Sequence, residues 1–255
     1  MAVEISDKEK IKQFLFEDPI HNAMLIRRIF FQENKPIVFA DDLQNTKAVA
    51  VVLLPDDDED DYSLALHAKD AEMAENVLQA IPRGKYWIHI ADELCLRVLR
   101  KHMRMGWFNL AWLLVLRSKK SLKEPPYQVT NVDNKWARKI ATIWSSDWDA
   151  EEYIKERIEN GLSAGICLDD ELIAWSLTHF ETDDTSALGM LYVHPQYRGR
   201  GYAEAVTTHL IKDAMEKGKT PMCHVFEDNL PSIQLYESLG FEKVCKQGWG
   251  DGVTL

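Results

Sequence analysis

The chain has 255 residues, more than the roughly 100 to 200 that one domain usually takes. Its composition, 46% hydrophobic and 28% charged, is that of a globular protein rather than a disordered one. Acidic residues number 41 against 30 basic ones, which gives a net charge of −11. A negative surface repels nucleic-acid phosphates and anionic lipids, so we expect no nucleic-acid partner and no membrane partner.

Targeting and metal signals are lacking in the sequence. The first residues, MAVEISDKEK, are polar and lack the apolar core of a signal peptide. No stretch approaches the roughly 18 to 20 apolar residues of a membrane-spanning helix. The four cysteines form no CxxC pair, and the eight histidines form neither HxxxH nor HExxH. We therefore expect a cytoplasmic protein with reduced thiols and no metal site.

The first half of the chain alternates helical and strand-like patterns of apolar residues. In chain order, the spacing predicts helices over residues 10–16 and 22–31, strands over 36–40, 47–54 and 62–67, a helix over 71–81, a strand over 86–90, a helix over 93–103 and a strand over 107–116. The acidic residues 56–61 are predicted to form a solvated hairpin tip, because a calcium loop needs spaced ligands.

Residues 118–126, SKKSLKEPP, end in a double proline, which neither a helix nor a central strand tolerates. We place a boundary there, between a domain of residues 1–120 and one of residues 127–255. Beyond it, the pattern predicts helices over 136–144 and 151–158, strands over 163–168, 172–180 and 187–193, then a helix, a strand over 221–226, a helix and a final strand. The similar order of elements in the two halves predicts a duplicated α/β architecture.

The segment that carries chemistry begins where the strand over 187–193 ends. After Gly201 the apolar residues follow a helical stripe, and Gly218 is predicted to end that helix. The intervening RGRGYA, residues 198–203, therefore forms a turn and the first helical residues. Free N–H groups at the helix start, glycines that admit close approach and the Arg198 and Arg200 charges make an anion site.

Two nucleotide-binding motifs fit this anion site poorly. The dinucleotide fingerprint needs a small residue where this chain has Glu204. A P-loop would need a glycine at Asp213, and its Gly-Lys-Thr ending here leads into a strand rather than a helix. An ordinary glycine-containing turn between a strand and a helix is the remaining alternative.

Residues 198–203 match the (Gln/Arg)-x-x-Gly-x-(Gly/Ala) motif of the GNAT superfamily of CoA-dependent N-acyltransferases. The preceding YVHPQY resembles the strand-then-Pro-x-Tyr entry of that superfamily. The downstream NLPSIQLYESLGF, residues 229–241, resembles its second CoA-contacting segment. Within the superfamily, residues 175–177 and 192–229 are most similar to glycine N-acyltransferase-like proteins.

The resemblance implies an α/β fold of two tandem GNAT-like domains. Each would have a mixed, mostly antiparallel central sheet flanked by helices, and the C-terminal one a splayed pair of parallel strands. The N-terminal domain lacks the phosphate motif, so we interpret it as a degenerate copy.

The resemblance also implies which residues bind acetyl-CoA or another acyl-CoA. Strand backbone groups would pair with the pantetheine arm, and an N–H near Tyr192 would polarise the thioester carbonyl. The loop and the helix start would hold the phosphates. The expected cofactor-binding residues are Leu191, Tyr192, Val193, Arg198, Gly199, Arg200, Gly201, Tyr202, Ala203, Asn229 and Ser232.

Tyr236 is the expected general acid, because the matching tyrosine of the superfamily protonates the leaving thiolate; a core tyrosine is the alternative. Asn229 is expected to cap the helix that carries Tyr236 as well as to contact CoA. Cys223, in the neighbouring strand, lacks a motif that would make it a nucleophile.

The general base is less evident. The position at which the glycine N-acyltransferase-like group has a glutamate holds Ala187 or Ser186 here, so this sequence departs from the pattern. Glu181 is the expected substitute, with His179 beside it, and a water relay is the alternative. The other histidines weighed for this role are His194 and His224.

Residues 144–149, WSSDWD, join two predicted helices that usually flank the acceptor site in this fold. The tryptophans either hold a cationic amine by cation–π contact or pack on the core beside a helix cap.

We therefore expect an acyl-CoA-dependent N-acyltransferase, most simply an acetyltransferase, acting on a small amine or amino acid in a ternary complex. The alternatives are a glycine or amino-acid N-acyltransferase that uses a longer acyl-CoA, and a non-catalytic CoA-binding module. The oligomeric state is open, and a homodimer is compatible with the sequence.

Overall fold

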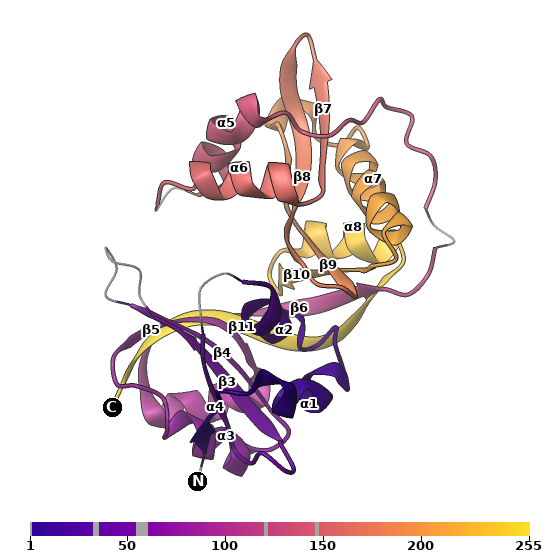
Figure 1. The fold of residues 1–255 in the computed structure, drawn as a ribbon. Helices are drawn as coiled ribbons and strands as arrows, with labels where there is room; N and C mark the ends of the chain where they lie inside the picture. The colour runs from indigo at the N-terminus through magenta and orange to yellow at the C-terminus, as the bar shows by residue number, and fades with distance from the viewer. Residues whose placement is uncertain (1, 33–35, 55–60, 120–121, 146–147) are drawn as a thin grey trace. The chain divides into compact units, whose positions relative to one another are not determined.

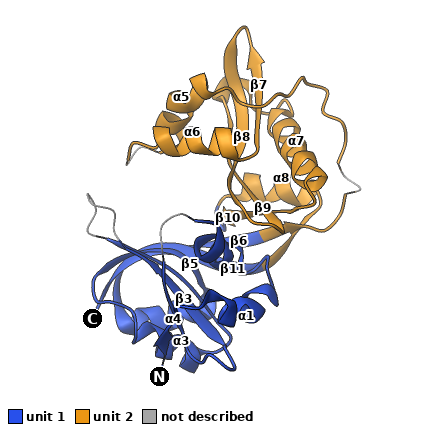
Figure 2. Ribbon diagram, viewed as in Figure 1, with its two compact units in different colours: residues 1–113, 226–228, 245–255 blue, residues 114–225, 229–244 orange. Residues whose placement is uncertain are grey.

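The computed structural model describes residues 2–32, 36–54, 61–119, 122–145 and 148–255. The chain forms two compact units (Figure 2): unit 1 comprises residues 1–113, 226–228 and 245–255, and unit 2 comprises residues 114–225 and 229–244. Strands β6 (Met103–Leu116) and β11 (Phe241–Thr254) contribute residues to both units. Residues 245–255, which the predicted boundary assigns to the second domain, lie in unit 1.

The other elements of unit 1 are, in chain order, β1 (Val3–Glu4), η1 (Lys8–Ile11), α1 (Lys12–Phe16), α2 (Ala23–Ile26), the π-helical turn η2 (Arg27–Phe31), β2 (Ile37–Ala40), β3 (Ala48–Leu53), β4 (Tyr62–Ala68), α3 (Ala71–Leu78), β5 (Lys85–Asp92) and α4 (Glu93–His102). Successive strands are antiparallel except β4 and β5, which run parallel, and β11 pairs antiparallel with β5.

Helices cover both faces of the unit 1 sheet, because successive side chains of a strand point to opposite sides. On β3, Ala48, Ala50 and Val52 belong to the buried cluster that includes residues of α3 and α4. The intervening Val49 and Val51 pack with apolar residues of the N-terminal helices. This arrangement explains why β3 reads as a continuous apolar run. The acidic run, residues 56–61, lies outside the described residues apart from residue 61.

The elements of unit 2 are η3 (Asn134–Trp136), α5 (Ala137–Trp144), α6 (Glu151–Asn160), β7 (Ser163–Leu168), β8 (Glu171–Glu181), β9 (Thr185–Val193), η4 (Pro195–Tyr197), α7 (Tyr202–Glu216), β10 (Thr220–Phe226) and α8 (Leu230–Ser238). Strands β7, β8 and β9 are antiparallel, and β10 runs parallel to β9. Helices α5 and α6 pack on Trp175, Leu177 and Met190, and Figure 1 shows α7 on the other side of these strands.

The two units repeat one order: three antiparallel strands, a helix, a parallel strand, a helix and a last strand. The predicted α/β fold class of two GNAT-like copies is therefore confirmed. The predicted helix over residues 22–31 differs in detail, because α2 passes into the π-helical turn η2. Among the described residues, no helix is long and apolar enough to cross a membrane.

Candidate functional site

The parallel strands of unit 2 diverge. Strand β10 pairs with β9 from Thr220↔Thr185 to Cys223↔Leu188, and the described residues show no β9–β10 pairing beyond that point. In unit 1 the corresponding pair, β4 and β5, stays paired as far as Leu66↔Ala91, with a register shift between Leu64 and Ala65. The splay predicted for residues 187–193 and 221–226 is thus present in unit 2. Beyond Leu188 the backbone groups on this edge of β9 have no β10 partner among the described residues, as an extended ligand that pairs with a strand would require.

A β-bulge lies on β9 within this open stretch. Trp175 pairs with Tyr192 and Leu177 with Gly189, so two residues of β9 oppose one residue of β8. Met190 has φ +48°, a left-handed conformation that non-glycine residues rarely adopt. A bulge leaves its extra residue outside the ladder and re-aims the backbone. Leu191 lies in this bulge, and Tyr192 and Val193 follow it; these are the three residues predicted to contact pantetheine. Leu191 and Tyr192 are half-buried, and Val193 is buried.

The loop after β9 carries the residues of the predicted anion site. The Arg198 guanidinium donates from Nε to the Val193 carbonyl oxygen at 3.0 Å, which ties the loop to the strand end. Gly199 and Gly201 have φ +73° and +84°, conformations for which glycine is best suited. Helix α7 begins after Gly201 with no side-chain cap among the described residues. Its first N–H groups and its positive dipole end therefore suit a phosphate.

A hollow beside this loop brings in a residue that the sequence reasoning missed. It is lined in part by Lys123, Tyr127, Arg200 and Gly201. The Tyr127 hydroxyl donates to the Arg200 carbonyl oxygen, and the Tyr127 ring lies 4.4 Å from that of the predicted Tyr202. Tyr127 follows the double proline in a segment without a motif, so only the fold could place it here.

Helix α8 places Tyr236 at the vertex of the splayed strands. The side chain of Asn229 accepts a hydrogen bond from the Ser232 N–H at 3.3 Å, which confirms the predicted helix cap. Tyr236 is buried, and its hydroxyl is hydrogen-bonded to Cys223, the last residue of β10 that pairs with β9. Burial raises the pKa of the Tyr236 phenol and that of the Cys223 thiol well above their usual values. Tyr236 is thus protonated at neutral pH, and Cys223 is a neutral thiol.

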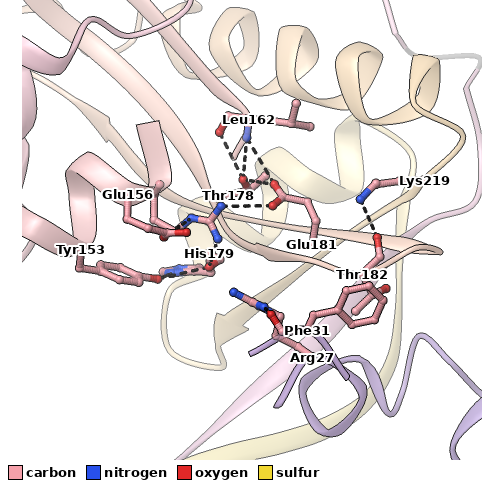
Figure 3. A network of polar contacts seen from close by, with 11 residues as sticks. Arg27, Phe31, Tyr153, Glu156, Leu162, Thr178, His179, Glu181, Thr182 and Lys219 are labelled. Atoms are coloured by element: carbon pink, nitrogen blue, oxygen red, sulfur yellow. Dashed lines mark hydrogen bonds and ion pairs between the residues drawn. The ribbon is translucent and has the colours of Figure 1, made fainter. Parts of the chain in front are cut away.

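Glu181, the predicted base, lies in a polar network at the end of β8 (Figure 3). One of its oxygens pairs with Arg157 Nη2 at 3.3 Å, and the other accepts from the Leu162 N–H at 3.3 Å and from the Thr178 hydroxyl. Arg157 is buried and also donates to the His179 carbonyl oxygen at 3.2 Å. Protein donors thus occupy both carboxylate oxygens, so a proton from an amine could reach Glu181 only if one of these contacts were given up.

Glu181→Gln is expected to destabilise unit 2 by about 3 kcal/mol, because it leaves the buried Arg157 guanidinium with only the exposed Glu156 carboxylate, 3.2 Å from Nε, as an anionic partner. Glu171→Gln, at the other end of the same strand, removes only an exposed pair with Lys139 and is the matched control. Urea unfolding followed by circular dichroism measures both variants. Equal midpoints for the two variants would show that the Arg157–Glu181 pair contributes no net stability.

An aromatic cluster, defined by Trp144, Trp148, Tyr153 and His179, lies next to the bulge. Trp144 stacks on Tyr153 with ring centroids 5.6 Å apart and also contacts His179 and Trp148. The two tryptophans are 38% and 53% exposed. A Cβ at position 189 would lie 2.2 Å from His179 Nε2, so the imidazole lies directly against the Gly189 backbone.

The three histidines considered as possible general bases have different surroundings. Burial, together with nearby His224 and Arg157, lowers the pKa of His179 to about 4, so its imidazole is neutral but a weak base. His194 Nδ1 accepts from the Gln196 N–H at 3.4 Å at the start of η4. His224 is half-buried on β10.

In the segment over residues 144–149, Asp149, the residue before the N-cap Ala150 of α6, accepts from the Glu151 N–H at 3.1 Å. Residues 146–147 lie outside the described residues.

Sequence comparison matches part of the chain to known proteins. Residues 163–250 match the family described as FR47-like protein. Over 73 residues the chain is 37% identical to mycothiol acetyltransferase of Kocuria rhizophila, a match that covers 27% of this chain and 24% of that protein. The chain thus spans about a quarter of the length of this relative.

Solved structures match the whole chain in fold. A Drosophila protein superposes with a TM-score of 0.76 at 16% identity, over 99% of this chain and 98% of its own. A GNAT-family acetyltransferase from Colwellia psychrerythraea gives 0.61 at 14% identity and covers 99% of each chain. A tandem GNAT protein from the clavulanic acid biosynthesis pathway gives 0.61 at 13% identity, over 99% of this chain and 97% of its own. Residues 163–250 thus resemble the FR47-like family, and the whole chain shares the fold of these GNAT-family structures.

Proposed function

We propose that unit 2 transfers an acetyl group from acetyl-CoA to a primary amine. The proposal rests on three structural features that follow one another along β9 and the loop after it. These are the divergence of β9 from β10, the bulge at Met190, and the start of α7 after Gly201 without a side-chain cap. Together they offer backbone groups to a pantetheine arm and N–H groups to a phosphate. The match to an acetyltransferase over 73 residues supports the same chemistry.

In the proposed reaction, the neutral amine attacks the thioester carbonyl carbon within a ternary complex. A backbone N–H released by the bulge near Tyr192 stabilises the developing oxyanion. The nitrogen–carbon bond forms, the carbon–sulfur bond breaks, and the Tyr236 phenol gives its proton to the leaving thiolate. Water removes the ammonium proton in this proposal, and Glu181, predicted as the base, positions β8 through Arg157.

The acceptor is proposed to be a small amine or amino acid that lies against the aromatic cluster. The exposed faces of Trp144 and Trp148 can contact an alkyl or cationic group, and His179 connects the cluster to Gly189, the residue before the bulge. His179 is neutral near pH 7 and therefore does not repel a cationic amine.

Arg200→Gln tests the phosphate site. Arg200 is exposed and lies over the Tyr197 ring, so its loss should leave the fold intact. We expect acetyl-CoA affinity, measured by calorimetry, to fall about tenfold, which corresponds to about 1.4 kcal/mol. Arg138→Gln removes an exposed charge elsewhere in unit 2 and is the matched control. Equal affinity in the two variants would place the CoA phosphates away from Arg200.

A thiol-release screen tests the activity. Acetyl-CoA is offered with amines, amino acids, polyamines and peptides, and free CoA is measured. Benzoyl-CoA and longer donors distinguish the alternative, a glycine N-acyltransferase-like enzyme. Binding of acetyl-CoA without thiol release for any pair would favour a non-catalytic CoA-binding module, and a chain that binds no CoA would exclude all three functions.

A further inference from the structure

A second group of chemistry-bearing side chains lies in unit 1, outside the site proposed above. The His–Asp cluster consists of His21, His67 and Asp92. His21 Nε2 lies 3.2 Å from His67 Nδ1 and 3.0 Å from Asp92 Oδ1, and His67 Nδ1 lies 2.6 Å from Asp92 Oδ2. Two imidazole nitrogens and a carboxylate thus converge on one point.

The cluster lies where a ligand site is expected in an open parallel sheet, at the carboxyl ends of neighbouring parallel strands. His67 is the penultimate residue of β4, Asp92 is the last residue of β5, and His21 is in the turn before α2. In unit 2 the corresponding strands diverge. In unit 1 they stay paired as far as Leu66↔Ala91, and residues 69–70 alone join β4 to α3. This end of unit 1 therefore presents side chains in place of a cofactor cleft.

The donor set is the one that zinc-like ions prefer. Imidazole nitrogen and carboxylate oxygen bind such ions at about 2.0–2.2 Å, and tetrahedral ligands at that distance lie about 3.3 Å from one another. The separations of 2.6–3.2 Å among His21, His67 and Asp92 need only a small expansion to reach this geometry.

Neighbouring residues hold the three ligands in orientation. His21 Nδ1, the nitrogen turned away from the cluster, lies 3.4 Å from Cys245 Sγ. Gln247 donates from Nε2 to Asp92 Oδ1 at 3.0 Å, and the Phe14 ring stacks on His67. Metal-binding histidines typically use their second ring nitrogen in this way, which fixes the tautomer and the ring plane.

We propose that the His–Asp cluster binds one zinc-like divalent ion through His21 Nε2, His67 Nδ1 and the Asp92 carboxylate. Three protein ligands leave at least one position of the ion open to water. The proposal departs from the expectation of no metal site, which rested on short motifs. These ligands are 25 and 46 residues apart in sequence, so no motif could reveal them.

Calorimetric titration of the full chain with Zn²⁺, after treatment with a chelator, tests the proposal. We expect one ion per chain, with affinity reduced at least 100-fold in His67→Asn and unchanged in the control His209→Asn, a half-buried histidine on α7. Cys245→Ser keeps all three ligands and should retain the stoichiometry with about tenfold weaker binding. Equal Zn²⁺ binding by the wild type and His67→Asn would overturn the proposal.

A second measurement needs no variant. Co²⁺ added to the wild-type chain should give the strong visible absorption of an ion with four ligands that include imidazole. The weak spectrum of aqueous Co²⁺ would instead show that the cluster is a hydrogen-bonded group without a metal.

Discussion

Tyr236→Phe is expected to lower kcat about 100-fold or more, with little change in the KM for acetyl-CoA. The substitution keeps the ring, which packs edge-on against Phe241 at 5.0 Å, and removes only the hydroxyl at the vertex of the splayed strands. Without that proton donor the thiolate must leave unprotonated, and positioned acid catalysis contributes about 10²- to 10⁴-fold. Steady-state kinetics with the acceptor found by the thiol-release screen measures the effect.

Two further variants separate catalysis from packing. Tyr86→Phe removes a buried hydroxyl in unit 1, where it donates to the Pro82 carbonyl oxygen at 2.7 Å, and should leave kcat unchanged. Cys223→Ala removes the hydrogen-bond partner of Tyr236 but keeps the phenol, so we expect a change of no more than a few-fold. If Tyr236→Phe turned over at the wild-type rate across pH, the general acid would have to be another group.

Gly240→Ala is expected to destabilise unit 2 by about 3 kcal/mol or more. Gly240 has φ +95°, and a Cβ there would lie 2.1 Å from the Ser118 carbonyl oxygen. That backbone cannot move away freely, because the Gly240 carbonyl accepts hydrogen bonds from the Arg117 and Ser118 N–H groups. Left-handed strain costs about 1–3 kcal/mol by itself, and the clash adds to it. Urea unfolding measures the loss.

Gly218→Ala is the matched control for this prediction. Gly218 follows α7 with φ +73°, and a Cβ at this position would meet no atom within 4 Å. The two alanine variants thus share backbone strain and differ in the contact with residue 118, so Gly218→Ala should cost about 1 kcal/mol. A Gly240→Ala midpoint equal to that of Gly218→Ala would mean that the segment around Ser118 moves aside at little cost.

The duplicated fold supports different chemistry at equivalent strand ends. In unit 2, eight residues, 194–201, connect β9 to α7 and provide the turn before an uncapped helix. In unit 1 the corresponding connection is two residues long, and Asp70 caps α3 by accepting from the Met73 N–H at 2.8 Å. A carboxylate that already caps the helix start occupies its N–H group and carries negative charge, so it disfavours the binding of another anion there. The interpretation of unit 1 as a copy without a CoA phosphate site follows from this difference.

Local features of the sequence predicted local structure well. The end of α7 at Gly218, the Asn229 cap and the strand–turn–helix around residues 198–203 are each confirmed, because turn glycines, caps and apolar periodicity act within a few residues. The roles of Tyr236 and Glu181 stay predictions. For Glu181, the sequence contained no sign that Arg157 and Thr178 would occupy its carboxylate.

The order of predicted elements indicates a duplicated α/β architecture within the 255 residues, because apolar periodicity records local backbone needs, and the motif over residues 198–203 occurs in one copy alone. The point at which the parallel strands diverge, and the contact of Tyr236 with Cys223 there, depend on tertiary packing. The tertiary structure also brings Tyr127 to the loop before α7 and joins His21, His67 and Asp92 from separate elements. These contacts join residues distant in sequence, and packing against the sheet, rather than any local pattern, creates them.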